Sequence, residues 1–322
     1  MIVASSAASN LPERSWPLAY GGVFELRKLR RGGEWLLLKG PARQPSRQSL
    51  AAEFRISQEW QARLERWEPR VRLPRVRTYD VAADQLCREW IDGRPWRIGR
   101  FTTRAGRRRQ QRQWQALGRW LGGLHRLSRN GIADPWAALL ADWEKPSAGK
   151  ILQQVGLDSV QASILRRLAC RRRRQPMDWP LCRLHGDFSP VQVLETRRNL
   201  VVLDLASSRL GMDFEDLAHW CAYFDTLAPW RRWRLEWPAF FRGYYPDGSE
   251  WNGSGKWMRE FLGWARLRAM VRWWGRRLQA GGTLHFAAER LIWASSQRRF
   301  LRLYARLLPH LPPVQPTLPQ AG

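Results

Sequence analysis

The chain has 322 residues, and 55 lysine and arginine residues against 28 aspartate and glutamate residues give it a formal net charge of +27. Its length and its apolar content of 44% predict one large or two moderate folded domains, and exclude a disordered tail, a fibre and a small disulfide-stapled module. The sequence contains no run of about 18–20 apolar residues, the length that a membrane-spanning helix needs, and residues 1–10 lack the pattern of a signal peptide. We therefore expect a cytoplasmic protein.

Arginine supplies nearly all of the positive charge. One explanation is codon usage in a GC-rich genome. The other is a surface that attracts anions such as nucleotides, phosphorylated glycans, acidic lipid head groups or nucleic acid. The two explanations are compatible.

The cysteines argue against a metal or redox centre. They form no C-x-x-C pair, and scattered cysteines of this kind are typical of reduced thiols in a cytoplasmic protein. They are Cys87, Cys170, Cys182 and Cys221.

Residues 18–92 are predicted to form a small antiparallel sheet with one helix. Short apolar runs beside glycine and proline favour strands, and the apolar residues between Ser49 and Trp67 recur roughly at helical spacing. The expected strands are Tyr20–Arg27 and Glu34–Lys39, joined by a turn at 31–33, followed by Arg75–Val81 and Gln85–Ile91. The sequence D-G-R-P at 92–95 is expected to be a hinge to a second lobe.

From about residue 110 onward the apolar spacing is helical, most clearly over Phe261–Leu278 and Ala287–Leu308. The expected exception is one hairpin, with strands at Val191–Leu194 and Leu200–Leu205. We therefore predict an α+β protein with an N-lobe at 18–92 and a mainly helical C-lobe at 93–310. Residues 1–17 would be an N-terminal extension, and residues 311–322 a loose, proline-rich tail.

The most specific local sequence is L-H-G-D-F-S-P-V-Q-V-L at 184–194, followed by V-V-L-D-L at 201–205. Asp187 and Asp204 lie at the edges of one expected hairpin, so their carboxylates can meet across it. Phosphoryl transfer needs such a pair: one carboxylate orients or deprotonates an attacking hydroxyl, and the other holds magnesium against nucleotide phosphates. Taken separately, each residue fits an ordinary loop or strand-end aspartate better than a catalytic one.

These motifs resemble the aminoglycoside phosphotransferase and choline kinase group, small-molecule kinases with the protein-kinase-like fold. The family pattern H-G-D-x-x-x-x-N, an apolar strand, a turn and L-D matches residues 185–205 in spacing, and G-x-x-x-x-D-L-A matches 211–218. Less specific matches are L-H at 124–125 and E-W-I-D-G at 89–93. The resemblance covers about residues 18–300 and implies a bilobal fold.

The resemblance also implies a role for each matching residue. Asp187 would be the catalytic base, Asp204 a magnesium ligand, and His185 an organiser of the catalytic loop. Lys39 would contact the α- and β-phosphates and pair with Glu53, for which Glu59 is a rival. The implied cofactors are ATP and Mg²⁺.

Further nucleotide contacts are expected in two places. The resemblance places Gly21 and Gly22 in a loop over the phosphates, although the full G-x-G-x-x-G pattern is missing. It places Glu89 and Ile91 in the hinge beside the base.

Gln192 departs from the family pattern, which has asparagine at this position. Its amide oxygen is the same metal ligand, displaced by about one bond length because the side chain is one methylene longer. Mg²⁺ demands near-ideal octahedral geometry, so this departure raises the hypothesis of a weakened metal site and a slow or inactive enzyme.

The histidines other than His185 are predicted to have structural roles. His219, His285 and His310 have no partners at metal-ligand spacing and are predicted to be packing or surface residues, and His125 is predicted to form internal hydrogen bonds.

Arginine and tryptophan alternate over residues 230–237 and 264–274. This pattern fits a bulky core covered by arginine stems, which we favour, or a surface that stacks on sugars, bases or a membrane interface.

The leading hypothesis is an ATP-dependent kinase that phosphorylates a hydroxyl group of a small-molecule or glycan-type acceptor. The basic composition favours an anionic or sugar-containing acceptor over a polycationic one. The alternative is a catalytically impaired kinase-like protein that binds a partner or an anionic surface. Nucleic acid is not expected as a partner, and peripheral contact with an anionic membrane surface and the oligomeric state are left open.

Overall fold

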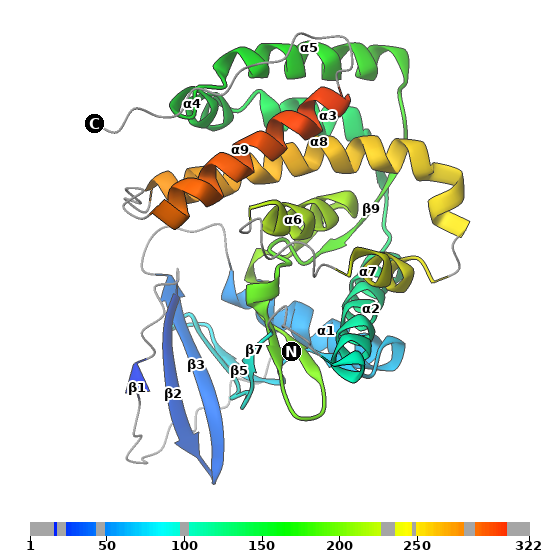
Figure 1. Cartoon of the computed structure of the whole chain (residues 1–322). Coiled ribbons are helices and arrows are strands. Elements are labelled where there is room, and N and C mark those ends of the chain that lie inside the picture. The colour runs from blue at the N-terminus through cyan, green and yellow to red at the C-terminus, as the bar shows by residue number, and fades with distance from the viewer. Residues whose placement is uncertain are drawn as a thin grey trace.

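The structure of the protein is a computed structural model that describes residues 16–17, 24–42, 49–96, 103–226, 236–246, 249–279 and 287–307. A small antiparallel sheet built by the N-terminal part of the chain lies beside a larger, mainly helical part (Figure 1). The predicted α+β class, with an antiparallel sheet followed by helices, is confirmed. Most of the expected N-terminal extension and all of the expected proline-rich tail lie outside the described residues.

The N-terminal sheet has the strand order β1-β2-β3-β6-β5, and every neighbouring pair is antiparallel. Gly32 and Gly33 join β2 to β3, and their φ angles of 56° and 83° lie in the region that favours glycine. Both predicted strand pairs are present. The strands are β1 (Trp16–Pro17), β2 (Phe24–Arg31), β3 (Glu34–Ala42), β5 (Val76–Asp80) and β6 (Gln85–Glu89).

Helix α1 (Leu50–Trp67) contacts β5 and β6 of this sheet. Ser49 caps its N-terminus, because the serine hydroxyl accepts a hydrogen bond of 3.2 Å from the backbone N–H of Ala52. The buried face of the helix carries mostly apolar residues, but Glu53 is buried with them. The helix therefore brings one carboxylate into the interior.

A second sheet joins the hinge to the predicted hairpin. Its order is β4-β11-β10-β7, with β4 (Val71–Arg72), β7 (Arg94–Pro95), β10 (Val193–Glu195) and β11 (Leu200–Val202). β7 is part of the predicted hinge at residues 92–95 and pairs antiparallel with β10. A Cβ atom at Gly93 would lie 3.1 Å from the carbonyl oxygen of Glu195, so the hinge passes close to the hairpin.

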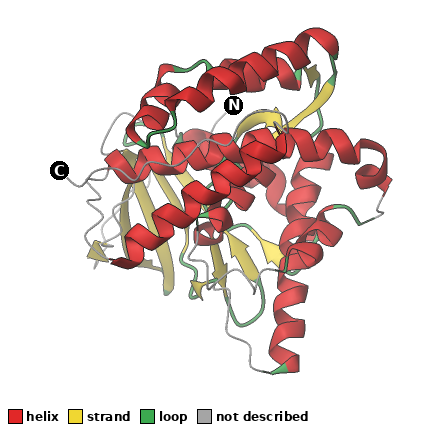
Figure 2. Ribbon diagram, turned by 45° about the horizontal axis from the view of Figure 1, so that its top comes forward, coloured by secondary structure: helices red, strands yellow, loops and turns green. Residues whose placement is uncertain are grey.

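Helices dominate the rest of the described chain (Figure 2). Helices α2 and α7 touch through their backbones, because Cβ atoms at Gly118 and Gly243 would lie 2.0 Å and 1.9 Å from the carbonyl oxygens of Phe240 and Gln115. Among the described residues, none of the helices is both long and apolar enough to cross a membrane. The helices are α2 (Arg104–Leu127), α3 (Pro135–Trp143), α4 (Pro146–Gln154), α5 (Asp158–Arg174), α6 (Phe214–Asp225), α7 (Trp237–Tyr244), α8 (Ser249–Gln279) and α9 (Ala287–Leu307).

The prediction of a single hairpin in the helical part was wrong. A third sheet, β12-β9-β8, contains β8 (Ile132–Ala133), β9 (Trp179–Leu184) and β12 (Arg209–Met212). Pro180 argues against a central strand, because proline lacks the backbone donor. It is tolerated because β12 pairs with β9 only from Leu181 to Leu184. Two short 3-10 turns complete the region, η1 (Pro190–Gln192) and η2 (Leu205–Ser207).

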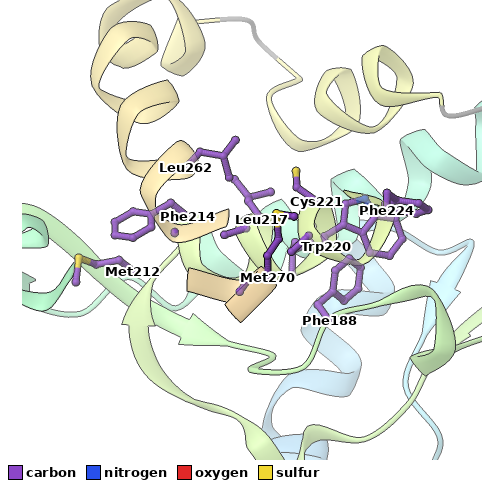
Figure 3. Close-up of a cluster of buried hydrophobic side chains, with 14 of the residues drawn as sticks. Phe188, Met212, Phe214, Leu217, Trp220, Cys221, Phe224, Leu262 and Met270 are labelled. Atoms are coloured by element: carbon purple, nitrogen blue, oxygen red, sulfur yellow. The ribbon is translucent and has the colours of Figure 1, made fainter. Parts of the chain in front are cut away.

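The tryptophan-rich sequence mainly builds the core. Trp264 and Trp274 of α8 are fully buried, while Trp273 is partly buried. The core explanation therefore holds for most of this stretch, whereas Trp230 and Trp233 lie outside the described residues. Figure 3 shows side chains of α6, such as Leu217 and Trp220, packed between Phe188 and α8. This packing fixes α6 beside the H-G-D sequence.

Candidate active site

The H-G-D loop, residues 185–189, begins where β9 ends at Leu184. Gly186 has a φ angle of 84°, and a Cβ atom there would lie 2.1 Å from the carbonyl oxygen of Ser207. Only glycine avoids both the strain and the clash. The loop therefore lies directly against η2, the turn that follows Asp204.

A buried carboxylate holds the backbone of this loop. Asp216 of α6 accepts hydrogen bonds from the backbone N–H groups of His185 at 2.7 Å and Gly186 at 2.9 Å. Nε2 of His125 lies 3.1 Å from the same carboxylate, and its Nδ1 lies 2.6 Å from the Tyr244 hydroxyl. Burial alone would raise the pKa of Asp216, but its partners, with His125 first among them, hold that pKa below the usual value.

The His185 ring links the loop to the hairpin. Its Nε2 lies 2.9 Å from the carbonyl oxygen of Leu203, and its Nδ1 lies 3.3 Å from the backbone nitrogen of Asp187. A carbonyl oxygen can only accept and a backbone N–H can only donate, so these partners assign the ring proton to Nε2. The imidazole is fully buried and contacts backbone on both sides.

Asp187 projects from this loop among three polar side chains. One carboxylate oxygen, Oδ1, lies 3.0 Å from Nε2 of His219 on α6 and 3.7 Å from a guanidinium nitrogen of Arg276 on α8. The other, Oδ2, accepts a 2.9 Å hydrogen bond from the amide of Gln192. Burial would raise the pKa of Asp187, but the contacts with His219, Gln192 and Arg276 outweigh it and lower the pKa to about 2.

A buried lysine joins the N-terminal sheet to the hairpin. Lys39 of β3 donates hydrogen bonds to Glu53 at 2.7 Å and to Asp204 at 2.8 Å. The second oxygen of Glu53 accepts a 3.0 Å hydrogen bond from Arg88 of β6. The rival residue Glu59 is half-exposed and lies 4.0 Å from Arg63. Lys39 therefore pairs with Glu53, and the same ammonium reaches Asp204.

Asp204 itself has an uncommon backbone conformation, with φ of 62° and ψ of 75°. Few non-glycine residues adopt this left-handed region outside special sites. Burial would raise the pKa of Asp204, but the charge and hydrogen bond of Lys39 lower it below its usual value. The residue is thus an ionised carboxylate at the end of the hairpin.

The predicted nucleotide contacts outside this cluster have different outcomes. Gly21 and Gly22 lie outside the described residues. The Glu89 side chain pairs with Arg72 and accepts a 2.7 Å hydrogen bond from the backbone N–H of Arg75, so it faces these arginines and not Lys39. Glu89 and Ile91 line an open cavity of about 1180 Å³, whose lining does not include Lys39, Asp187 or Asp204.

Asp216 and His219 are among the residues of this site that were not identified from the sequence. Asp216 belongs to the D-L-A sequence, which we matched without assigning it a role. The prediction that His219 is a packing or surface residue was wrong, because His219 contacts Asp187. The signal for both was helical spacing, since residues three apart lie on one face of a helix.

The donor atoms fit a magnesium ion held together with phosphates. Mg²⁺ prefers oxygen ligands and usually takes only one or two carboxylates from the protein, with water and phosphate completing its shell. In the described part of the chain, Oδ2 of Asp204 and Oε1 of Gln192 carry no hydrogen bond from protein and can serve as such donors. Among the described residues, no group of three or more histidine, cysteine, aspartate or glutamate side chains could hold a metal ion.

Comparisons with known proteins agree with this fold. A family model described as "phosphotransferase enzyme family" matches residues 22–270. The predicted resemblance to aminoglycoside phosphotransferases and choline kinases is therefore confirmed. No curated protein sequence matches the chain.

Several solved structures have a similar fold. The ethanolamine kinase of Plasmodium vivax is 13% identical with a TM-score of 0.57, and the match covers 89% of this chain and 81% of that one. The choline kinase of Cryptosporidium parvum is 12% identical with a TM-score of 0.56, covering 92% and 90%. The macrolide 2'-phosphotransferase of Brachybacterium faecium is 18% identical with a TM-score of 0.51, covering 93% of each chain. At these identities the likeness concerns the fold alone.

Proposed function

The chain belongs to the phosphotransferase enzyme family, and from this premise we propose that it is an ATP-dependent small-molecule kinase of the cytoplasm that phosphorylates a hydroxyl group of a small or glycan-type acceptor. The observation that carries the proposal is the buried Lys39 ammonium held by both Glu53 and Asp204. In kinases of this fold such a lysine binds nucleotide phosphates, and the glutamate on the helix keeps it in place.

Asp187 is the proposed catalytic residue. The acceptor hydroxyl oxygen attacks the γ-phosphorus, the bond from that phosphorus to the departing ADP oxygen breaks, and the hydroxyl proton passes to the Asp187 carboxylate. A carboxylate with a pKa of about 2 is a weak base. Its main contribution is therefore to orient the hydroxyl, and the proton moves late, when the new bond to phosphorus has made the hydroxyl acidic.

Lys39 and Asp204 are proposed to handle the nucleotide. Lys39 binds phosphate oxygens while Glu53 holds its ammonium. Asp204 and Gln192 are the residues that would hold magnesium, and the ion when bound neutralises charge on the phosphates. Asp216 and His185 keep the H-G-D loop in the shape that presents Asp187.

The alternative of an impaired, binding-only protein receives little support. It was motivated by Gln192 in place of asparagine. The amide nitrogen of Gln192 donates to Asp187, which leaves its oxygen as the donor for a cation. In this one conformation, the longer side chain can donate a hydrogen bond to Asp187 through its nitrogen and bind a cation through its oxygen.

The test is to measure thermal unfolding of the wild type and of two variants, with magnesium and ATP together and with each of them alone. A ligand at about 100 times its dissociation constant stabilises the folded state by about 2.7 kcal/mol, which raises the midpoint by several degrees. We expect this shift in the wild type and its loss in Asp204→Asn, with Asp158→Asn as an exposed matched control. ADP formation by the same proteins gives the second readout. A wild type without a magnesium-dependent shift contradicts the proposal.

A further inference from the structure

Three arginines lie four residues apart on α8, so they form one row along the helix. The first, Arg268, is buried and pairs with Asp142 and Glu215. The second, Arg272, lies 3.7 Å from Asp142. The third, Arg276, reaches the H-G-D loop. The row thus ends at the residue that we propose as the catalytic carboxylate.

Arg276 differs from the first member of the row in how its donors are used. Its nearest guanidinium nitrogen lies 3.7 Å from Asp187, which is within ion-pair distance but beyond a hydrogen bond. In the described part of the chain its N–H groups have no hydrogen-bond acceptor, and 57% of the side chain is exposed. A guanidinium presents five donors in a rigid fork that matches a carboxylate or a phosphate. These donors are therefore available to a ligand.

The position of Asp187 indicates that the ligand of Arg276 is the acceptor. An acceptor hydroxyl must lie against the Asp187 carboxylate, so the rest of the acceptor lies within reach of Arg276. Asp187 contacts two basic side chains, His219 and Arg276, and the guanidinium of Arg276 is always charged. An ammonium group beside Arg276 would meet a cation, whereas an acidic group there would meet a guanidinium whose N–H donors form no hydrogen bond within the described part of the chain.

We propose that the acceptor carries a carboxylate or phosphate group close to the hydroxyl that is phosphorylated, and that Arg276 binds this group. The inference rests on the proposed kinase function and names its class of acceptor. The formal net charge of +27 acts in the same direction, because it raises the local concentration of anions by long-range attraction.

A matched set of hexoses tests the proposal, with glucose as the neutral member, glucosamine as the cation, and glucuronate and glucose 1-phosphate as the two acids. Binding is measured by calorimetry with magnesium and a non-hydrolysable ATP analogue, and transfer from ATP is measured by mass spectrometry. We expect both acids to bind more tightly than glucose, and glucosamine to bind more weakly. The two acids separate recognition of a carboxylate from recognition of a phosphate.

Variants of Arg276 assign the effect to the residue. Arg276→Gln is expected to weaken binding of the acids about tenfold or more, because it removes a charged hydrogen-bonding partner, and to weaken binding of glucose much less, because glucose has no acidic group. Arg276→Glu is expected to reverse the preference toward glucosamine. Arg302→Gln, an exposed arginine on α9 with the same change of charge, is the control.

Two results overturn the proposal. One is that neither acid binds more tightly than glucose to a wild type that magnesium and ATP stabilise. The other is that Arg276→Gln lowers transfer to every acceptor by the same factor, which would place Arg276 on the transferred phosphoryl group. A wild type that magnesium and ATP do not stabilise would instead contradict the kinase function itself, so the two failures are distinguishable.

Discussion

The Lys39 ammonium donates a 2.8 Å hydrogen bond to Asp204 across a separation of 165 residues. This contact joins β3 of the N-terminal sheet to the end of the hairpin that carries the H-G-D loop. Because Glu53 holds the same ammonium, three separate parts of the chain meet at one buried charge.

Replacing Lys39 is expected to slow phosphoryl transfer strongly. Lys39→Met removes the charge that would bind phosphate, and a loss of about 10²–10³-fold in kcat is expected for such a group. Lys39→Arg is not expected to restore activity, because a planar guanidinium does not fit a site built around a compact ammonium. ADP formation measures both. Lys28→Met on β2 is the control, and unchanged turnover in Lys39→Met would show that the lysine has no catalytic part.

His219 is expected to position Asp187. His219→Ala removes the 3.0 Å contact with Oδ1, so the carboxylate can rotate, and kcat is expected to fall about 10–100-fold with the KM for ATP unchanged. His219→Gln keeps a donor in the region and is expected to recover part of the loss. Steady-state kinetics separate the two parameters. A rise in the KM for ATP at constant kcat would instead place His219 at the nucleotide.

Gly186→Ala is expected to disrupt the H-G-D loop. The added methyl group would lie 2.1 Å from the carbonyl oxygen of Ser207, and alanine is strained at a φ angle of 84°. Strain and backbone displacement of this kind cost about 1–3 kcal/mol or more in unfolding free energy. Chemical denaturation measures this cost, and Gly33→Ala, which has open space around it, separates strain from clash. Equal effects of the two substitutions would mean that the contact with Ser207 is unimportant.

Gln192→Asn, which restores the family residue, is expected to lower activity. The shorter side chain would lose the 2.9 Å hydrogen bond to Asp187 or would withdraw its oxygen from the cation position. Turnover measured against magnesium concentration is the test, and a lower kcat or a higher magnesium requirement is expected. A clear gain in kcat would revive the hypothesis of an impaired enzyme.

The cysteines are expected to react with iodoacetamide at very different rates. Burial raises the pKa of the Cys182 thiol, and it raises the pKa of Cys221 to about 12, so neither forms the reactive thiolate at pH 8. Cys170 is exposed on α5. Peptide mass mapping should find Cys170 labelled first, and Cys182 and Cys221 labelled only after unfolding. Rapid native labelling of Cys182 would contradict the packing of β9.

Local patterns predicted the helices and the N-terminal strands well because the periodicity that identifies them is local. The helix beginning after Ser49 and the hairpin at 193–202 illustrate this, since spacing and turn residues fix both. β9 was missed because Pro180 argues against a central strand, and what permits it is the register with β12, a relation between distant segments.

In the site, too, local motifs were predictable and contacts between distant segments were not. Motif spacing pointed to Asp187 and Asp204, whose neighbours in sequence form the hairpin. The contact between His219 and Asp187 depends on how α6 packs against the loop, and the contact of Arg276 depends on α8. Neither helix position is encoded in the residues around the motif.

Glu53 binds two cations with its two oxygens, Lys39 on β3 and Arg88 on β6, and all three side chains are buried. In many protein kinases the equivalent helix swings in and out to control activity. Here an outward swing of α1 would leave Arg88 without this carboxylate in the interior, a loss that costs several kcal/mol for a buried pair. The second ion pair of Glu53 therefore adds to the cost of moving α1 away from the sheet.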